Sequence, residues 1–594
     1  MPNLLAMSFE GELAPSFDLR CLQPGRALPD GWGIGYYPGG EPSATVLKEP
    51  APPPGSIRSE LVKAWEHLES SLFVLHVRHA TWGAPTSANT QPFQRAFGRR
   101  DWLFAHSGSL RERPTTRPNP LFEAVGSTDT EAVLCDLLGR IAERGWSSLG
   151  EVDPEVLLAW FGSLNELGTL SSVLTDGHDL VVYADRDPTA TGIWVREVRP
   201  PYDQLVLADD DLSVDLTSRG PKSRKGILVS SDPLAVMAGV SDAAAMTPSD
   251  GGAWRKLPPG TLLTIRQGAA SDERRPGESA PQPSLPGLRS RHLTRPEPAP
   301  ARLYDVTHRT VYSYERAVER SSHLFRLRPF HDPLQTVHRH ELACSVDGLV
   351  RDYEDVFGNF TRKLAVDRPF DSMVVVARSR VEVLDTDPLS YRALRASTTL
   401  PLTWMPWQRQ ILGPFLLPEE LPESQLSELV EYAMSFVERN DSDLIETLLD
   451  MNETIHREYA YVQGVTNLAT TPFETYVNRR GVCQDFTNLF MCLCRLLSIP
   501  ARYVCGYLYT GPKAANQVQA EASHAWAQVY VPEVGWRGFD PTNGVMTQTS
   551  HVRVAVGRSW RDATPTSGTI FVGGSGERLE VDVKVEPVEP TSPF

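Results

Sequence analysis

The sequence predicts a multidomain protein of mixed α+β class, and three observations lead to that prediction. The chain has 594 residues, which is too long for one domain and suggests roughly three to five. Before residue 267, short β-like apolar runs such as SLFVLHVRHA and DLVVYAD are mixed with helical patterns such as TDTEAVLCDLLGRIAERG. After residue 301, apolar and polar residues alternate with period two as far as about residue 386, which predicts a β-rich region.

The composition is that of a soluble globular protein. The chain is 41% hydrophobic and 22% charged, and its net charge of −16 argues against nucleic acid as a partner. No apolar run approaches the roughly 20 residues of a membrane-spanning helix, and the N-terminus lacks the pattern of a secretory signal. Seven cysteines, few and odd in number, fit reduced thiols in a cytosol better than a disulfide framework. We therefore expect a cytoplasmic protein without membrane or nucleic-acid partners, and the oligomeric state stays open.

The clearest domain boundary is residues 267–301, a stretch rich in Pro, Ser, Gly and charge that lacks apolar periodicity. Such a composition cannot bury enough apolar surface to fold, so we expect a linker there. The expected domains are residues 1–266, a β-rich region at 302–390, and a core at 391–594 that ends in C-terminal strands. Within the core, residues 419–458 carry two helical stretches, each with a proline or an Asp/Ser start signal.

The most informative stretch is RRGVCQDFTNLFMCLCRLLSIPARYVCGYL. In it a turn leads into Cys483, and a helix-like apolar run follows from Phe486 to Leu497. A cysteine in the first turn of a helix lies beside unpaired backbone N–H groups and the positive dipole end, which favour the thiolate. His524 then begins a predicted strand in SHAWAQVYV, and Asp540 ends another in GWRGFDPTNG. These residues can act as nucleophile, proton carrier and orienting carboxylate.

The motifs GVCQDF, SHAWAQVY and GWRGFDPTN, in this order, resemble the signature of the transglutaminase-like cysteine-hydrolase superfamily, in its bacterial peptidase-like branch. YDVTHRTVYSYE, RLRPF and VFGNF upstream resemble the β-rich N-terminal region of those proteins, so the resemblance covers nearly all of residues 302–575. It implies a papain-like helix-plus-sheet core with a catalytic triad of Cys483, His524 and Asp540. It implies no metal or cofactor. The implied substrates are a peptide, a protein, or a γ-glutamyl or other amide, with hydrolysis favoured over crosslinking.

Two kinds of group near Cys483 are candidates for stabilising a developing oxyanion. The hydroxyls of Tyr459 and Tyr461 are one, although tyrosines in such a pattern more often pack in a core. The backbone N–H of Gln484, directly after the nucleophile, is the other. Cys492 and Cys494 lie two residues apart on the same predicted helix and lack partners at metal-ligand spacing, so we expect them to be core thiols.

A second set of motifs occupies the first 130 residues: LPDGWGIGYY, HVRHATWG, NTQPF, FAHSGSL and GSTDTEA. Together they resemble the class II glutamine amidotransferase domain, which implies a four-layer αββα N-terminal-nucleophile hydrolase fold over roughly residues 1–265. The resemblance places Arg78 at the position that binds the carboxylate of glutamine and Asp129 at the position that binds its α-amino group. Both roles make chemical sense, because a guanidinium pairs with carboxylate and a carboxylate with ammonium. Gly108 matches the oxyanion glycine.

The departures from that family fall on the reacting groups. The family's N-terminal cysteine is replaced by Pro2, which has no side-chain nucleophile, and its oxyanion asparagine is replaced by Ser107. We therefore expect a degenerate glutaminase domain that is inactive towards glutamine. Arg78 and Asp129 are expected either to bind glutamine or a γ-glutamyl group, or to persist only as residues that stabilise the fold.

Three functions follow from these observations. The favoured one is a cysteine-dependent enzyme that acts on an amide, peptide or isopeptide bond through an acyl-enzyme at Cys483. The first alternative is a non-catalytic binding or scaffold protein, which the complete triad disfavours. The second is a glutamine amidotransferase that supplies ammonia to a partner, which Pro2 disfavours strongly.

Overall fold

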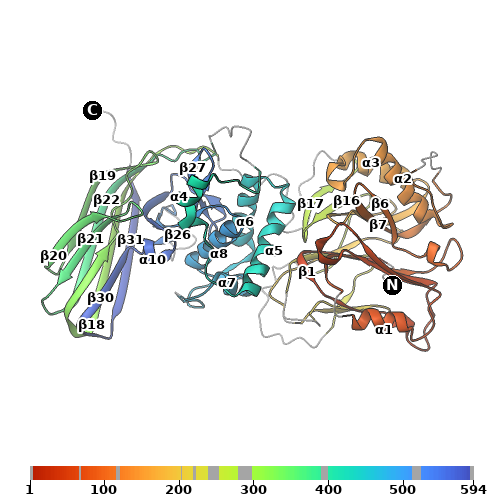
Figure 1. Ribbon diagram of the computed structural model, residues 1–594, viewed down its shortest axis with the longest axis horizontal. Coiled ribbons are helices and arrows are strands. Elements are labelled where there is room, and N and C mark those ends of the chain that lie inside the picture. The colour runs from red at the N-terminus through yellow and green to blue at the C-terminus, as the bar shows by residue number, and fades with distance from the viewer. Residues whose placement is uncertain are drawn as a thin grey trace. The chain divides into compact units, whose positions relative to one another are not determined.

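The computed structural model divides into two compact units, Met1–His292 and Leu293–Phe594 (Figure 1). Both mix helices with sheets, as the α+β prediction requires. Among the described residues, no helix combines the length and apolar character needed to cross a membrane. The structure describes residues 4–65, 68–114, 121–202, 204–217, 223–237, 253–277, 297–389, 399–467, 469–511 and 523–588.

Two sheets that face each other form the centre of the first unit. The seven-stranded sheet has the order β15 (Arg255–Lys256), β10 (Trp194–Val198), β13 (Gly226–Ser230), β1 (Leu4–Leu13), β5 (Ser70–Arg78), β3 (Gly31–Tyr36) and β4 (Thr45–Pro50). The six-stranded sheet has the order β17 (Ala269–Arg274), β16 (Leu262–Arg266), β9 (Asp179–Tyr183), β8 (Gly168–Thr175), β7 (Arg100–Leu110) and β6 (Phe93–Phe97). One buried apolar cluster contains side chains of both sheets, including Ala6 and Val74 from the first and Ala105 and Val173 from the second.

Different layers cover the outer faces of these two sheets. Helices α2 (Asp129–Glu143) and α3 (Pro154–Asn165) pack on the six-stranded sheet around Phe104 and Phe161. The seven-stranded sheet is covered by one helix, α1 (Ile57–Ala64), and by a short third sheet. Within the described residues, the expected helical fourth layer is therefore mostly sheet. That third sheet has the order β14 (Ala235–Val236), β11 (Val206–Ala208), β12 (Ser213–Asp215) and β2 (Ser16–Asp18).

The start of the expected linker is wrong. Strand β17 lies within residues 267–301 and pairs antiparallel with β16, so the first unit extends beyond residue 266. Its sequence, AASDER, is polar, but Ala269 and Ala270 are buried and Glu273 is paired with Arg275. Edge pairing and ion pairs hold this strand, and apolar periodicity does not reveal such contacts. Residues 278–296 of the expected linker lie outside the described residues.

The second unit begins with the predicted β-rich region. Its sheet has the order β19 (Gln335–Cys344), β22 (Phe370–Val383), β18 (Arg302–Phe325), β21 (Phe360–Val366) and β20 (Leu349–Glu354). The C-terminal strands β30 (Thr566–Ser575) and β31 (Arg578–Pro587) pair with β18. They therefore complete the β-rich sheet, and the assignment of these strands to the core is wrong.

The core of the second unit packs helices against a five-stranded antiparallel sheet (Figure 1). That sheet has the order β28 (Val545–Met546), β27 (Gly535–Asp540), β26 (His524–Val531), β25 (Ala501–Leu508) and β29 (His551–Gly557). Apolar side chains of α8 (Cys483–Leu496), such as Leu489 and Leu493, share one buried cluster with Ala525 and Ala527 of β26. The helices are α4 (Pro406–Leu416), α5 (Glu423–Arg439), α6 (Leu444–Glu458), α7 (Pro472–Asn478), α8 (Cys483–Leu496) and α10 (Trp560–Ala563), and a small parallel ladder joins β23 (Ala460–Tyr461) to β24 (Arg480–Gly481).

Candidate active site

Cys483 is the first residue of helix α8, as the sequence predicts. The Asp485 carboxylate accepts hydrogen bonds from the Val482 N–H at 2.8 Å and from the Thr466 hydroxyl at 2.7 Å, and so ties the loop before α7 to the first turn of α8. Gly481 is required by close approach, because a Cβ there would lie 2.8 Å from two atoms of the Asp485 side chain. The helix begins at a fixed point, and the thiol lies beside first-turn N–H groups that have no intrahelical acceptor.

The turn before Cys483 is anchored by a buried cation. Arg479 closes α7 in the left-handed conformation (φ 50°), and its side chain is almost fully buried. The guanidinium lies 4.7–4.9 Å from the ring centres of Tyr432, Tyr459 and Tyr476 and donates a hydrogen bond to the Tyr432 hydroxyl at 3.0 Å. Buried cation–π contacts of this kind stabilise a fixed backbone path.

The structure brings Cys483, His524 and Asp540 together. His524 begins β26 and Asp540 ends the neighbouring antiparallel strand β27, so both residues lie at the same end of these two strands. His524 Nε2 lies 2.8 Å from Asp540 Oδ2, and the Cys483 thiol is in hydrogen-bonding contact with the same imidazole. Because Nε2 faces the carboxylate, Nδ1 is the ring nitrogen left for the sulfur.

The electrostatics of the pair favour an imidazolium beside a carboxylate. Burial lowers the pKa of His524, but the charge and hydrogen bond of Asp540, together with Cys483, outweigh it and raise that pKa to about 10. Burial raises the pKa of Asp540, but His524 and His551 outweigh it and hold that pKa far below its ordinary value. Both side chains are at least 98% buried, so water screens their attraction little.

Two residues of this centre were not foreseen from the sequence. Asn543 Nδ2 donates to Asp540 Oδ2 at 2.7 Å, and His551 Nε2 lies 3.2 Å from the same oxygen. The other oxygen, Oδ1, accepts the backbone N–H groups of Thr542 and Asn543. Asn543 lies three residues after Asp540 in the DPTN turn, and its side chain folds back onto the Asp540 carboxylate. A contact this short in sequence could have been predicted from the turn. His551 lies on another strand, and no spacing rule connects it to Asp540.

The two tyrosines proposed as oxyanion donors lie in different surroundings. Tyr459 is buried, its hydroxyl lies 3.4 Å from that of Tyr432, and its ring packs on Phe486, so it is a core residue. Tyr461 is 37% exposed, and burial followed by the nearby Cys483 raises the pKa of its hydroxyl. Tyr461 therefore lies within electrostatic range of the sulfur, and the half-buried Gln484 directly follows Cys483 in the chain.

Cys483 differs from five of the other six cysteines in its exposure. It is partly exposed, as is Cys344, whereas the other five are buried. Burial raises the thiol pKa of Cys492 and Cys505 to about 12 and that of Cys494 still further. The interpretation of Cys492 and Cys494 as core thiols is confirmed by their burial. Among the described side chains, no group of three or more His, Cys, Asp and Glu is arranged to hold a metal ion.

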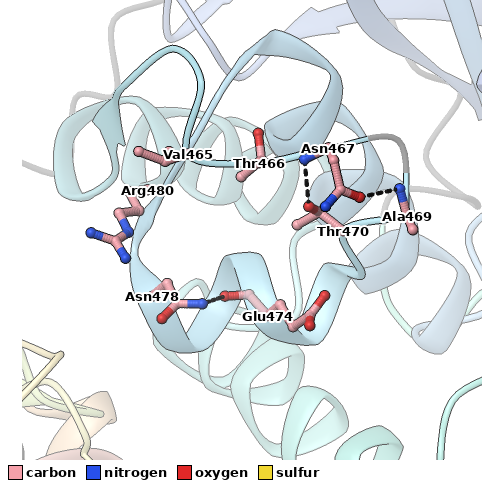
Figure 2. Close-up of a pocket in the computed structure, with 8 residues that line it drawn as sticks. All are labelled: Val465, Thr466, Asn467, Ala469, Thr470, Glu474, Asn478 and Arg480. Carbon is pink, nitrogen blue, oxygen red and sulfur yellow. Dashed lines mark hydrogen bonds between the residues drawn. The ribbon is translucent and has the colours of Figure 1, made fainter.

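A polar pocket of about 280 Å³ lies on the segment that leads into Cys483 (Figure 2). Figure 2 shows side chains of the loop 465–470 on one side and of helix α7 on the other. Thr466, which lines the pocket, is the residue that donates to Asp485 in the first turn of α8. The lining residues are Val465, Thr466, Asn467, Ala469, Thr470, Glu474, Asn478 and Arg480.

In the first unit, the four residues of the expected glutamine site line one pocket: Arg78, Ser107, Gly108 and Asp129. Arg78 ends β5, and its guanidinium donates to the carbonyls of residues 82–84 at 2.7–3.2 Å. Asp129 begins α2 and accepts the N–H of Leu110 at 2.8 Å and that of Thr130 at 2.9 Å. Pro2 lies outside the described residues.

The backbone and the histidines of this pocket are also constrained. Gly108 has φ +144°, and a Cβ there would clash with the Thr169 carbonyl. His76 and His106 are buried in the lining, and burial lowers the pKa of both, that of His76 to about 3. Both rings are therefore neutral at physiological pH. Arg78 and Asp129 therefore line the same pocket as these two buried histidines.

Comparison with known sequence families agrees with this division. Residues 1–287 match the class-II glutamine amidotransferases, residues 304–382 the bacterial transglutaminase-like N-terminal region, and residues 431–541 the transglutaminase-like superfamily. The matched spans define a class-II glutamine amidotransferase domain followed by a transglutaminase-like region and core. The chain belongs to the transglutaminase-like superfamily through its second half and to the class-II glutamine amidotransferases through its first.

Individual relatives match one part of the chain each. An uncharacterized protein of Mycobacterium tuberculosis is 30% identical over 303 residues, which cover 48% of this chain and 93% of the relative. The protein YafJ of Escherichia coli, which bears the name of a glutamine amidotransferase, is 28% identical over 207 residues, covering 34% of this chain and 78% of that one.

Among solved structures, a protein from Cytophaga hutchinsonii described as a cysteine protease has 20% identity and a TM-score of 0.37, covering 50% of this chain and 93% of that one. A glutamine amidotransferase-like protein from Pseudomonas aeruginosa has 24% identity and a TM-score of 0.34, covering 45% and 98%. These TM-scores are low, and the family assignment rests on the sequence families.

Proposed function

We propose that this chain is a cysteine-dependent hydrolase that cleaves an amide, peptide or isopeptide bond through an acyl-enzyme at Cys483. The observation that supports this function best is the buried His524–Asp540 pair, at 2.8 Å, in contact with a partly exposed thiol at a helix N-terminus. A buried ion pair is costly unless it is fully hydrogen-bonded, and here Asp540 has five donors around it. A non-catalytic scaffold would have no need of such a cluster beside an accessible thiol.

The chemistry follows from the atoms in place. The Cys483 sulfur attacks the carbonyl carbon of the substrate, and the proton held by His524 passes to the leaving amine as the C–N bond breaks. Water then attacks the resulting thioester, His524 takes a proton from it, and the carboxylic acid leaves with Cys483 restored. Asp540 keeps the imidazole oriented and stabilises its positive charge throughout. The first-turn N–H groups of α8 and the Tyr461 hydroxyl are the donors available to the oxyanion.

The pocket on the segment before Cys483 supports a polar acyl substrate. Hydroxyl and amide groups of Thr466, Asn467, Thr470 and Asn478 line it, which suits the backbone or polar side chains of a peptide. Arg480 at its edge adds a cation that can pair with a substrate carboxylate. Glu474 and Arg480 put one carboxylate and one guanidinium on the same pocket, so polar peptide amides, γ-glutamyl amides among them, are the first substrate class to test.

Thiol labelling tests the proposal. The wild-type chain, Cys483→Ala and His524→Ala are treated with iodoacetamide, and the alkylated peptides are quantified. We expect Cys483 to react much faster than Cys344, the other partly exposed thiol, and to slow at least tenfold when His524 is removed. Equal rates at the two cysteines, with no dependence on His524, would show that the triad assignment is wrong.

Trapping the acyl group tests the reaction itself. Hydroxylamine converts a thioester into a hydroxamate, so turnover of γ-glutamyl and peptide anilides in its presence measures acyl-enzyme formation. Partition between hydroxamate and free acid also separates aminolysis from hydrolysis. Hydroxamate should form with the wild type and be absent with Cys483→Ala.

We further propose that the first unit binds glutamine or a γ-glutamyl group without hydrolysing it. The support is the pocket that holds Arg78 and Asp129 together, while the position of the family nucleophile is Pro2. Calorimetric titration of the full chain with glutamine, and with a γ-glutamyl dipeptide, tests this role. No heat of binding to the wild type, or equal heats for the wild type and Arg78→Ala, would exclude it.

A further inference from the structure

A second imidazole, that of His551, contacts the carboxylate of Asp540. His551 begins β29 and is 96% buried. Its Nε2 lies 3.2 Å from Asp540 Oδ2, and its Nδ1 lies 3.1 Å from the Ser550 hydroxyl oxygen. One carboxylate oxygen therefore receives two histidines, His524 at 2.8 Å on one side and His551 on the other.

The hydrogen-bond chemistry fixes the form of His551. An ionised carboxylate only accepts, so Nε2 of His551 must carry the proton that faces Asp540. Nδ1 faces the Ser550 hydroxyl, which can donate to it or accept from it. Both ring nitrogens of this buried imidazole therefore have a hydrogen-bond partner.

The surrounding packing fixes the positions of the His524 and His551 imidazoles relative to each other. The Trp526 ring is fully buried and contacts both, with centroid distances of 6.0 Å to His524 and 5.3 Å to His551. The His551 backbone is fixed by pairing with Leu508 of β25. His551 is thus a rigid donor aimed at the carboxylate.

We propose that His551 is a positioning residue of the active centre: its Nε2–H holds Asp540 in the orientation that pairs with His524 and draws negative charge away from the shared oxygen. This inference rests on the proposed cysteine chemistry. It predicts that His551 tunes the basicity of His524 although it contacts neither Cys483 nor the substrate. Without His551, Oδ2 keeps more charge for His524, so the imidazolium of His524 persists to higher pH.

Other charged groups near His551 must be separated from this effect. Besides Asp540, and His524 beyond it, Asp385 from the segment after β22 interacts with His551. Arg537 and Arg553 also face Asp385. Asp385→Asn therefore changes a charge near His551 without removing a contact to Asp540, and it serves as the matched control.

The test is the pH dependence of Cys483 alkylation by iodoacetamide in the full chain, with thermal unfolding followed in parallel. His551→Phe keeps a ring for Trp526 but removes the donor, and the upper midpoint of the alkylation profile, where His524 loses its proton, should rise by about half to one pH unit. His551→Gln places an amide N–H near the same oxygen and should restore the wild-type midpoint. Asp385→Asn should leave the midpoint unchanged.

Ser550→Ala provides a second route that leaves the imidazole in place. Loss of the hydroxyl partner of Nδ1 loosens the hold on the imidazole and weakens its Nε2–H contact with Asp540, so the upper midpoint should rise by a smaller amount. The proposal is overturned if His551→Phe leaves the upper midpoint unchanged or lowers it, or if His551→Gln or Asp385→Asn shifts it equally. If His551→Phe does not fold, the Ser550→Ala and His551→Gln profiles decide by the same criteria. Failure of the proposed cysteine mechanism gives a different result. In that case Cys483 would be alkylated at the same rate in the wild type and in His524→Ala.

Discussion

Replacing Asp540 with asparagine removes the charge that holds the His524 proton while it keeps the size of the side chain. The native pKa of His524 is about 10, against 6.5 for an ordinary histidine. A raised pKa contributes stability that is fully present below about pH 6.5 and is lost as the pH rises through about 10. The pKa of Asp540 is depressed, so its contribution is present above its ordinary value of 3.8 and is lost at lower pH.

The magnitude follows from the same values. A shift of one pKa unit corresponds to about 1.4 kcal/mol, so the His524 shift sets an upper limit of roughly 5 kcal/mol near pH 5.5. Removing one partner of a buried ion pair typically costs about 3–5 kcal/mol of folding stability, a range that lies within this upper limit. We therefore expect Asp540→Asn to lower the free energy of unfolding of the second unit by about 3–5 kcal/mol at pH 5.5. The difference in unfolding free energy between the wild type and Asp540→Asn should shrink towards zero as the pH approaches 10.

The assay is urea unfolding at pH 5.5, 7.5 and 9.5, followed by a signal specific to the second unit. Asp305→Asn is the control, because Asp305 forms a two-point pair with Arg380 in the same unit, but both side chains are nearly half exposed. Such an exposed pair contributes at most about 1 kcal/mol. A pH-independent loss for Asp540→Asn, or a loss no larger than that of Asp305→Asn, would refute the assignment of a buried imidazolium–carboxylate pair.

Three further outcomes are expected. Gly481→Ala places a Cβ against the Asp485 side chain, and it should slow Cys483 alkylation at least tenfold with a smaller effect on the unfolding midpoint in urea. Arg479→Ala removes a buried guanidinium from three tyrosine rings and should cost about 2–4 kcal/mol in urea unfolding, whereas Arg480→Ala next to it, which is exposed, should cost less than about 0.5 kcal/mol. Arg78→Lys keeps the charge but loses the planar fork, so calorimetry should show glutamine binding weakened at least tenfold.

The local parts of the cysteine centre could be predicted from the sequence because each rests on a short-range signal. The turn before an apolar helix fixes Cys483 at the start of α8, and period-two alternation fixes His524 and Asp540 at strand ends. Helices α5 and α6 are confirmed for the same reason, since proline and Asp/Ser signals mark their starts. In each case the residue and its signal lie within a few positions of one another.

The parts that the sequence did not reveal depend on contacts between distant residues. His551 meets Asp540 only because β29 and β27 lie in one sheet with β25 and β26 between them. The last two strands join the β-rich sheet because a single long strand, β18, accepts partners along both edges. Composition and periodicity describe the faces of a strand but do not say which strand will pair with it.

The two sites differ in what holds their charged residues. In the cysteine centre, Asp540 and His524 balance each other, so each needs the other to remain charged and buried. In the first unit, Arg78 and Asp129 are held largely by backbone groups of the protein itself, through the carbonyls of residues 82–84 and the N–H of Leu110. Those contacts stabilise the pocket whether or not a ligand is present. The presence of Arg78 and Asp129 is therefore weaker support for a function than the triad is, and titration with glutamine is the measurement that separates a binding site from a structural remnant.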